Sequence, residues 1–259
     1  MEKKNEESRM TENMQLEIFR YLPDKAGEPT MQTYEIPFHK DWVVLDAMNY
    51  IKNEIDGTLS YRWSCQMGVC GSCGIMINGV PKLSCATFLK DYFPNKIQIE
   101  PLTGFPVERD LIIEMDDFME KLSEVKPYII REENQEKTLD EGEHIQTPAE
   151  LAHFKQYSMC INCMLCYAAC PIYALDSTFI GPAAIALAQR YNLDSRDQGE
   201  NIRQETISSH EGIWECTFVG ECSAVCPKDV DPAAAIQRAK VSSTISWFKD
   251  VLIPWGKKK

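Results

Sequence analysis

The chain has 259 residues, of which 44% are hydrophobic and 25% are charged, and its formal net charge at pH 7 is −12. This composition predicts a globular protein of about two domains, and the acidic balance argues against a nucleic-acid binder. The eleven cysteines are an odd number, so they cannot all be paired in internal disulfides. The amino terminus lacks the apolar segment of a secretory signal, and no stretch approaches the apolar length of a membrane span. The sequence therefore predicts a protein of a reducing compartment whose thiols bind metal and whose contact with any membrane comes through a partner.

The first part of the chain predicts a short tail followed by a small mixed domain. Residues 1–13 are charged and without periodicity, which predicts a disordered tail, and the domain is expected to span residues 14–115. Alternating hydrophobicity and the turn pair Asn78-Gly79 predict the strands. They are residues 15–21, 31–36 and 96–100 and the hairpin of Gly74–Ile77 with Val80–Leu83.

A helix is expected between the second strand and the hairpin, with Asp41 as its cap. Its apolar residues at helical spacing are Val44, Met48, Ile51 and Ile55. The resulting order of strand, strand, helix, hairpin and strand is that of a ubiquitin-like β-grasp domain.

The second part of the chain, residues 116–259, predicts an all-helical domain. Residues 131–147 are polar and mainly acidic, which is typical of a connecting loop. Residues 182–191 and 232–248 are rich in alanine and each begin with proline at a plausible first helical position. Asp231 is expected to cap the second of these helices.

Four cysteines of the first domain have the C-x4-C-x2-C-x11-C spacing of a plant-type 2Fe–2S cluster. They are Cys65, Cys70, Cys73 and Cys85. Gly68, Gly71 and Gly74 lie among them and allow backbone N–H groups to approach the sulfurs. No histidine lies between Cys65 and Cys85, which argues against a Rieske centre.

The segment CINCMLCYAACP, from Cys160 to Pro171, has the C-x2-C-x2-C-x3-C-P spacing of bacterial ferredoxins. In that pattern the first three thiolates bind one cluster and the fourth binds another. A zinc knuckle and a disulfide loop are the alternatives. Zinc normally takes two separated cysteine pairs, and four thiols crowded into so short a stretch suit disulfides poorly. The spacing therefore favours iron and sulfide.

A second run, Cys216-x5-Cys222-x3-Cys226-Pro227, repeats this pattern with Val219 in place of the middle cysteine. Crossed ligation then predicts two groups of ligands. A 4Fe–4S cluster would be held by Cys160, Cys163, Cys166 and Cys226, and the other site by Cys170, Cys216 and Cys222. Three thiolates with an apolar fourth corner favour a 3Fe–4S cluster, and a 4Fe–4S cluster with an outside ligand is the alternative. Every cysteine is then used.

The sequence contains no dinucleotide fingerprint, Walker motif, nucleophile elbow or HExxH motif. Its four histidines are scattered and are expected to be surface or packing residues. They are His39, His144, His153 and His210. No catalytic residue is predicted, and three one-electron centres are typical of a relay between two sites that handle electron pairs, such as a flavin and a quinone. The predicted fold class is α+β: an N-terminal β-grasp, plant-type ferredoxin-like domain and a C-terminal all-helical, bacterial-ferredoxin-like domain.

With these motifs laid out, the sequence resembles the iron–sulfur subunit of succinate dehydrogenase and fumarate reductase complexes, from about residue 14 to the end of the last helix. In detail it is similar to bacterial quinol:fumarate reductases that use menaquinol. The segments that carry the resemblance are SYRWSCQMGVCGSCGIMINGVPKLSC, CINCMLCYAACP, FIGPAAIALAQRYNLDSRD and CTFVGECSAVCPKDVDPAAAI.

The resemblance implies that the first domain docks on an FAD-containing catalytic subunit, which performs the fumarate chemistry. It implies that the second domain lies on a membrane anchor at the cytoplasmic face of the inner membrane, with menaquinone at the interface. The family's quinone-lining residues match Thr217, Phe218, Gln237 and Lys240. Gln237 and Lys240 are spaced i, i+3 and share a helix face, for which a solvated face is the alternative.

Two positions bear on which quinone is used and on the direction of electron transfer. Many ubiquinone-linked succinate dehydrogenases have His where Thr217 stands and Trp where Leu175 stands. Their absence favours the menaquinone type and leaves the direction open, so the same role in a succinate:quinone oxidoreductase stays an alternative. Three rival functions compete with this family assignment: a subunit of another flavin-linked respiratory oxidoreductase, a free ferredoxin-like carrier and a zinc-stapled structural protein.

The carboxy-terminal stretch combines aromatic, apolar and basic residues. They are Trp247, Phe248, Val251, Leu252, Ile253, Trp255 and the lysines at 257–259. This mixture is typical of the membrane–water interface, and packing against the rest of the domain is the alternative.

Overall fold

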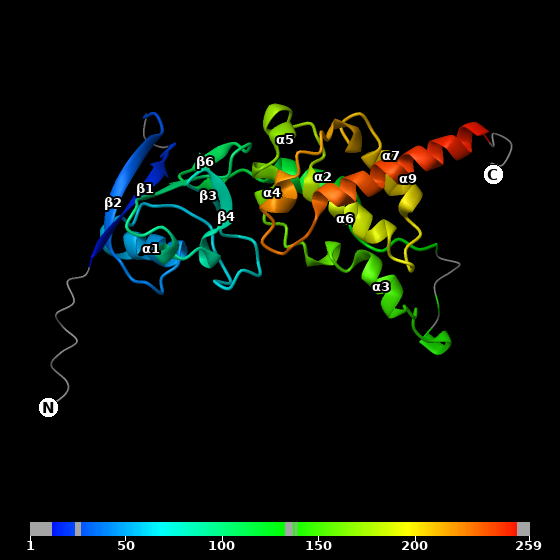
Figure 1. Ribbon diagram of the computed structural model, residues 1–259, viewed down its shortest axis with the longest axis horizontal. Helices are drawn as coiled ribbons and strands as arrows, with labels where there is room; N and C mark the ends of the chain where they lie inside the picture. Colours follow the sequence, from blue (N-terminus) through cyan, green and yellow to red (C-terminus); the bar gives the residue numbers. More distant parts are fainter. Residues whose placement is uncertain (1–11, 24–26, 133–136, 138, 253–259) are drawn as a thin grey trace. The chain divides into compact units, whose positions relative to one another are not determined.

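The computed structural model describes residues 12–23, 27–132, 137 and 139–252 (Figure 1). The chain forms two compact units, Met1–Glu114 and Met115–Lys259. Of the predicted tail, residues 1–11 lie outside the described residues, whereas Asn13 already belongs to the first strand. Within the described ranges, no helix has the length and apolar character needed to cross a membrane.

The first unit is built on a five-stranded sheet in the order β2-β1-β5-β3-β4. The strands are β1 (Asn13–Arg20), β2 (Thr30–Pro37), β3 (Gly74–Ile77), β4 (Val80–Leu83) and β5 (Ile97–Glu100). Strand β1 pairs antiparallel with β2 and parallel with β5, and β3 pairs antiparallel with β4 and β5. The alternation seen in the sequence is confirmed in β1, where Met14, Leu16 and Ile18 are buried. The predicted hairpin is also confirmed, with Asn78 and Gly79 at positive φ.

The predicted helix starts later than the sequence suggests. Helix α1 (Val44–Tyr50) begins after Val43, and the Asp46 carboxylate accepts the Val43 N–H at 3.0 Å. The expectation that Asp41 caps this helix is therefore wrong. The reason is tertiary, because Val43 is held in a bridge with Phe88, which delays the first helical turn beyond the reach of Asp41.

The end of this helix also departs from the regular pattern. A π-helical turn, Ile51–Ile55, continues α1. The wider turn displaces the last predicted core position, so that Ile55 is 49% exposed while Ile51 is buried.

Beyond the sheet, the sequence pattern missed a short ribbon of β6 (Val107–Arg109) and β7 (Ile112–Ile113). Asp110 lies between these strands and is fully buried. Its carboxylate accepts hydrogen bonds from Arg20 Nε at 3.0 Å and from the backbone N–H groups of Tyr21 and Ser60. The ribbon is therefore fixed to β1 through a satisfied buried charge rather than through apolar contacts.

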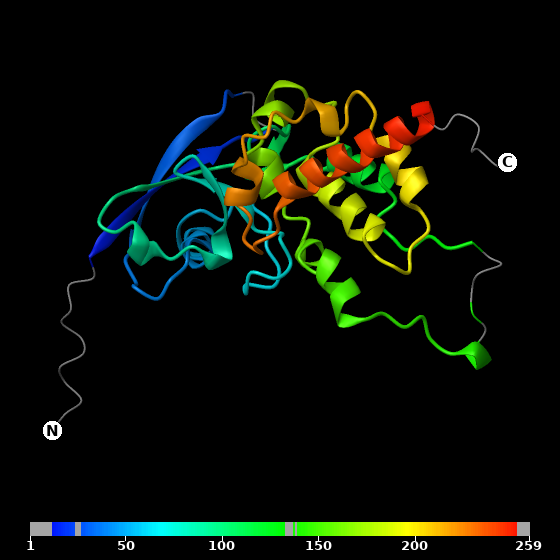
Figure 2. The same cartoon turned by 45° about the vertical axis from the view of Figure 1, so that its right-hand side comes forward.

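The second unit is helical. Its helices are α2 (Asp116–Glu124), α3 (Pro148–Phe154), α4 (Leu165–Ala168), α5 (Pro171–Leu175), α6 (Pro182–Asn192), α7 (Glu200–Ile207), α8 (Glu221–Ala224) and α9 (Pro232–Leu252). Together with the sheet of the first unit, they confirm the predicted α+β class. Helix α6 lies at the centre, side by side with α9 and α7 (Figures 1 and 2).

Small side chains allow this close packing. Ala183, Ala184, Ala186 and Ala188 of α6 are all buried, as are Ala235 and Ala239 of α9. Asp231 caps α9 as predicted, because its Oδ1 accepts the backbone N–H of Ala234 at 2.9 Å. The described part of the predicted connecting loop, residues 131–147, is irregular apart from a short 3-10 turn at Leu139–Glu141.

A buried ion pair ties the segment after α2 to α7. Arg203 and Asp197 are both buried and meet through two hydrogen bonds, of 2.7 and 2.8 Å. Arg203 also donates to the carbonyl oxygens of Lys126 and Tyr128, and Asp197 accepts the N–H of Ile130. Burial opposes ionisation of Asp197, but the hydrogen bonds from Arg203 and from the backbone outweigh it and lower the pKa of this carboxyl.

Candidate iron–sulfur sites

The first cysteine group lies in the loop before β3 and in the 3-10 turn after β4. Cys73 and Cys85 are buried, whereas Cys70 is exposed. The loop turns its N–H groups toward sulfur, and Cys65 Sγ accepts from three of them at 3.3–3.5 Å. The donors are Met67, Val69 and Cys70. A further N–H, that of Gly68, lies 3.2 Å from Cys85 Sγ.

The surroundings of these thiols shift their pKa values in opposite directions. The backbone N–H groups around Cys65 lower the pKa of its thiol to about 6. Burial and the neighbouring Cys73 thiol raise the pKa of Cys85 to about 12. Gly68 and Gly71 have positive φ, which residues other than glycine adopt at a cost, and this lets the loop curl around the sulfurs. The geometry is that of a loop built to stabilise sulfur-centred negative charge.

The second cysteine group surrounds a cavity in the second unit. Cys160, Cys163, Cys166 and Cys226 line it, together with Ala183 and Ala186 of α6. Asn162 and Met164 have positive φ and wind the chain between these thiols. Burial raises the pKa of Cys163 to about 11, so binding of a metal would have to release the proton.

The third cysteine group lines a neighbouring cavity of the same unit. Cys170, Cys216 and Cys222 line it with the loop of residues 217–220 and with Ile236 of α9. Val219 also lines this cavity, and its apolar side chain offers no ligand atom at that position of the loop. The backbone N–H of Phe218 lies 3.4 Å from Cys216 Sγ. Burial raises the pKa of Cys222 to about 11.

Cys166 and Cys170 are only four residues apart and yet line different cavities. In a continuous helix, residues at i and i+4 would share one face. Here α4 ends at Ala168, and Cys170 is extended, with φ −82° and ψ 114°. The proline at position 171 disfavours helical geometry at the residue before it, which gives the physical reason. The cysteines are thus divided between the cavities in the same groups as in the sequence pattern, while their role as ligands stays a prediction.

Beside the second cavity, the residue after Cys166 packs closely against a glycine. Tyr167, the residue after Cys166, is fully buried, and its hydroxyl donates to the Ile180 carbonyl at 2.8 Å. Its ring meets Phe118 and Tyr173 edge-on. Gly181 lies against this ring at φ +97°, and a Cβ there would be 2.1 Å from Tyr167 Cε1. Only glycine fits between α4 and the start of α6.

The structure brings Lys240, one of the predicted quinone residues, to the third cysteine group. Lys240 Nζ donates to the carbonyl oxygen of Cys216 at 2.8 Å. Gln237 is partly buried, and its Nε2 is a buried donor with no hydrogen-bond partner. Thr217 and Phe218 are exposed in the loop after Cys216. Neither Gln237 nor Lys240 is simply a solvated surface residue, and their role toward a quinone stays a prediction.

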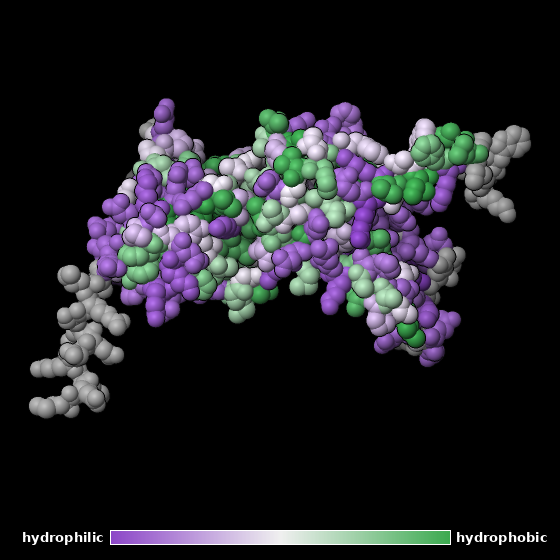
Figure 3. All heavy atoms as spheres, viewed as in Figure 1, coloured by the Kyte–Doolittle hydropathy of each residue, from purple (hydrophilic) through white to green (hydrophobic). Residues whose placement is uncertain are grey.

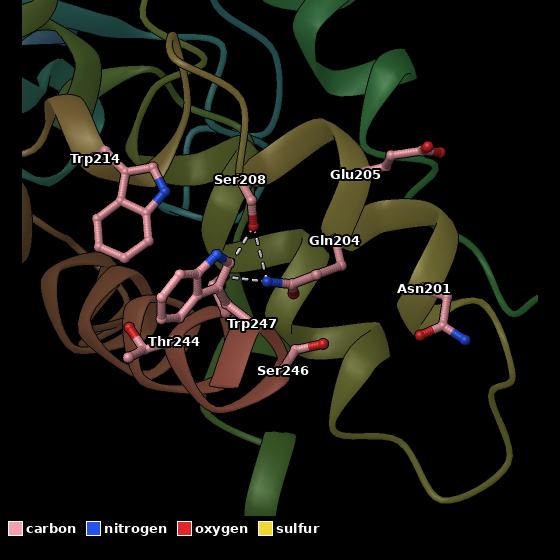
Figure 4. Close-up of a pocket in the computed structure, with 9 residues that line it drawn as sticks. Asn201, Gln204, Glu205, Ser208, Trp214, Thr244, Ser246 and Trp247 are labelled. Carbon is pink, nitrogen blue, oxygen red and sulfur yellow. Dashed lines mark hydrogen bonds between the residues drawn. The ribbon is translucent and has the colours of Figure 1, made fainter. Parts of the chain in front are cut away.

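Sequence reasoning missed a cleft of about 530 Å³ between α7 and α9 (Figure 4). The indoles of Trp214 and Trp247 line it, and Trp214 lies two residues before Cys216. Gln204 Nε2 donates to Ser208 Oγ at 2.8 Å and to Ser243 Oγ, whereas Gln204 Oε1 is buried without a partner. Isolated serines and a glutamine within helices carry no motif, so only the packing of two helices could reveal this cleft.

All the cysteines lie within two segments that match known iron–sulfur domain families. Residues 15–120 match the 2Fe-2S iron-sulfur cluster binding domain family, and residues 156–230 match the 4Fe-4S dicluster domain family. The fumarate reductase iron-sulfur subunit of Mycobacterium tuberculosis is 56% identical over 95% of this chain and 99% of its own length. The Escherichia coli subunit of the same name is 53% identical over 93% of this chain and 96% of its own length.

A solved structure shows the same fold. A chain of the Mycobacterium smegmatis Sdh1 complex in the apo form superposes with a TM-score of 0.83, at 23% identity, over 92% of this chain and 98% of that chain.

Fold and cysteine pattern together define an iron–sulfur electron-transfer protein with 2Fe–2S and 4Fe–4S dicluster domains. More narrowly, the chain belongs to the family of fumarate reductase and succinate dehydrogenase iron–sulfur subunits. This sets aside the zinc-stapled protein and the free ferredoxin-like carrier.

Replacing Gly181 with alanine tests the close packing of Gly181 against Tyr167, the residue after Cys166. The Cβ would overlap the buried Tyr167 ring at an unfavourable φ, so Gly181→Ala should lower the free energy of unfolding by about 2–4 kcal/mol. Chemical denaturation of the cluster-loaded protein measures this. The control is Gly57→Ala, where the nearest atom lies at an ordinary 3.7 Å and which should change stability by less than about 1 kcal/mol. Equal effects of the two variants would contradict the close packing.

Proposed function

We propose that the chain is the electron-transfer subunit of a quinol:fumarate reductase, connecting a menaquinol site at a membrane anchor with FAD in a catalytic subunit. The observation that carries this proposal is the pair of adjacent thiol-lined cavities separated by the single turn of α4. Clusters held in these two cavities of one unit would suit passage of single electrons. The dicarboxylate chemistry belongs to the flavoprotein partner.

The cysteines present fit three clusters, because every donor in each group is a thiol, the ligand that iron–sulfur clusters prefer. Cys65, Cys70, Cys73 and Cys85 would hold 2Fe–2S. Cys160, Cys163, Cys166 and Cys226 would hold 4Fe–4S, and Cys170, Cys216 and Cys222 would hold 3Fe–4S. When bound, these groups supply one-electron redox chemistry. The protein gathers the thiols into three groups, directs backbone N–H groups at the sulfurs of Cys65, Cys85 and Cys216, and buries most of the other thiols.

Sequence identity supports fumarate reduction as the direction. The relatives at 53% and 56% identity are named fumarate reductase subunits, whereas the succinate dehydrogenase iron-sulfur subunit of Coxiella burnetii is 34% identical. The second candidate is succinate:quinone oxidoreduction, in which electrons would run the other way through the same sites. Turnover of the intact membrane complex tests the two directions. Menaquinol:fumarate turnover should exceed succinate:quinone turnover, and the reverse order would favour the second candidate.

Two exposed apolar surfaces are suited to contacts with the proposed partner subunits. Met67 and Val69 precede the exposed Cys70 in the first loop and are 73% and 54% exposed, which suits an apolar contact with the flavoprotein. In the second unit, exposed apolar residues gather on α9 from Val241 to its end (Figure 3). They are Val241, Ile245, Trp247, Phe248, Val251 and Leu252. Ile253, Trp255 and the lysines at 257–259 lie outside the described residues.

The exposure of this α9 surface argues against the alternative that its side chains pack on their own unit. We infer that it meets the membrane anchor at the cytoplasmic face of the inner membrane, with the chain bound peripherally. Tryptophan and lysine are common at such interfaces, where an amphipathic ring has both an apolar and a polar neighbour.

A cysteine at position 219 tests the three-thiol site. Val219→Cys would supply the missing fourth thiolate in the loop that lines this cavity, so a 4Fe–4S cluster should replace the 3Fe–4S cluster. Low-temperature EPR of the oxidised complex measures this as loss of the 3Fe–4S signal. Val219→Ser is the matched control, because a hydroxyl is a poor ligand for these clusters. A wild type without any 3Fe–4S signal would contradict the three-cysteine assignment.

Removing the amide of Gln237 tests the quinone site. Gln237 Nε2 is a buried donor without a partner, and in the proposed site it would donate to a quinone carbonyl. Gln237→Leu should lower kcat/KM for menaquinol about 5–20-fold, as expected for loss of one such hydrogen bond. Reduction of fumarate by an artificial dye should be largely unchanged. The control is Arg238→Leu, at the adjacent exposed position. Equal losses in both assays would remove Gln237 from the quinone site.

Replacing the exposed apolar residues of α9 by polar ones tests membrane attachment. Replacing Trp247, Phe248 and Val251 together by serine should move most of the chain from the membrane to the supernatant, because the apolar area for the anchor is lost. Fractionation with spin counting of the clusters measures both location and integrity. The control replaces three exposed apolar residues elsewhere in the unit, Ile145, Leu151 and Met159. Release by both triple variants alike would contradict a docking role for α9.

A further inference from the structure

We propose that Lys240 raises the reduction potential of the three-cysteine centre by holding its ammonium charge against the loop that carries Cys216. This inference rests on the proposed function, since it takes Cys170, Cys216 and Cys222 as ligands of one cluster. It makes Lys240 a positioning and electrostatic residue for that centre, which is distinct from hydrogen bonding to a quinone.

The contact joins helix α9 to the cysteine loop. Lys240 lies one turn after Ile236, a residue of α9 that lines the three-cysteine cavity. Its Nζ donates to the Cys216 carbonyl oxygen at 2.8 Å, and the side chain is partly buried. Helix α9 also packs against the 3-10 turn Ile213–Glu215, immediately before Cys216. The helix therefore fixes where the ammonium group lies relative to the loop.

The Lys240 ammonium group lies close to the sulfur of Cys216, the residue whose carbonyl oxygen it contacts. Four covalent bonds separate the carbonyl oxygen of Cys216 from its Sγ, which places Nζ within about 8 Å of that sulfur. Reduction adds one negative charge to a thiolate-bound cluster, and a nearby positive charge favours the reduced state. At this range, and in partly buried surroundings, the effect on the reduction equilibrium should be at least about tenfold.

Two other charged residues, Glu221 and Lys249, are less well placed to act. Glu221 also lines the cavity, but it is exposed, so water and salt screen its charge. Lys249 lies nine residues further along α9 and is exposed. At 1.5 Å rise per residue its backbone is about 13.5 Å away along the helix, beyond a Debye length in physiological salt. Lys249→Gln is thus a matched control for the loss of one positive charge from the same helix.

The experiment is a redox titration of the intact membrane complex, followed by the EPR signal of the oxidised 3Fe–4S cluster. Lys240→Gln should lower the midpoint potential by the equivalent of at least tenfold in the reduction constant, about 59 mV for one electron. Lys240→Met, which keeps the apolar stem, should give a similar fall. Lys240→Arg and Lys249→Gln should keep the wild-type potential.

Several results would overturn the inference. A wild-type potential in both neutral variants, with full signal, would remove the electrostatic role while leaving the proposed function intact. An equal fall in Lys249→Gln would show a general effect of net charge. Loss of the signal in both neutral variants would assign Lys240 to holding the loop together instead. Absence of a 3Fe–4S signal in the wild type would contradict the three-cysteine assignment itself, so the two failures are distinguishable.

Discussion

The arrangement of the second unit depends on the proline that follows Cys170. Proline 171 keeps the preceding residue out of helical geometry, and Cys170 is accordingly extended between α4 and α5. Without that break, Cys166 and Cys170 would lie on one helix face and their thiols would crowd one cavity. The second run has the same cysteine–proline pair at 226–227, and Cys226 lines the opposite cavity from Cys222. Two such pairs divide seven thiols between two adjacent sites.

Burial gives these sites an electrostatic character of their own. The thiols of Cys163 and Cys222 have raised pKa values because their anions would be poorly solvated. Iron bound to these thiols would compensate this cost by stabilising the thiolate form, so metal binding and the folded state would stabilise each other. The first loop differs, because backbone N–H groups around Cys65 lower its pKa. The surroundings of the sulfurs therefore differ between centres before any partner is bound, and such differences tune reduction potentials.

Helix α6 gives the cavities a closely packed wall. Its alanines allow close contact with α9, and Gly181 at its start accommodates the ring of Tyr167. The Arg203–Asp197 pair then holds the segment after α2 against α7 without an unsatisfied charge. Close packing matters for electron transfer, because the clusters would need fixed positions. It also matters for Lys240, because its contact with the Cys216 loop depends on where α9 lies.

The amino-acid sequence by itself determined the cysteine groups, the alternating strand β1, the hairpin at Asn78-Gly79 and the cap at Asp231. All of these depend on local spacing or on a few neighbouring residues, which the order of residues records directly. The tertiary structure decided the late start of α1 through the Val43–Phe88 bridge, the exposure of Ile55, and the buried Asp110 beneath β6 and β7. It also decided that Lys240 meets the Cys216 carbonyl and that α7 and α9 leave a cleft between them. These features join residues distant in the chain, and no local periodicity carries a signal for contacts made only when the elements pack.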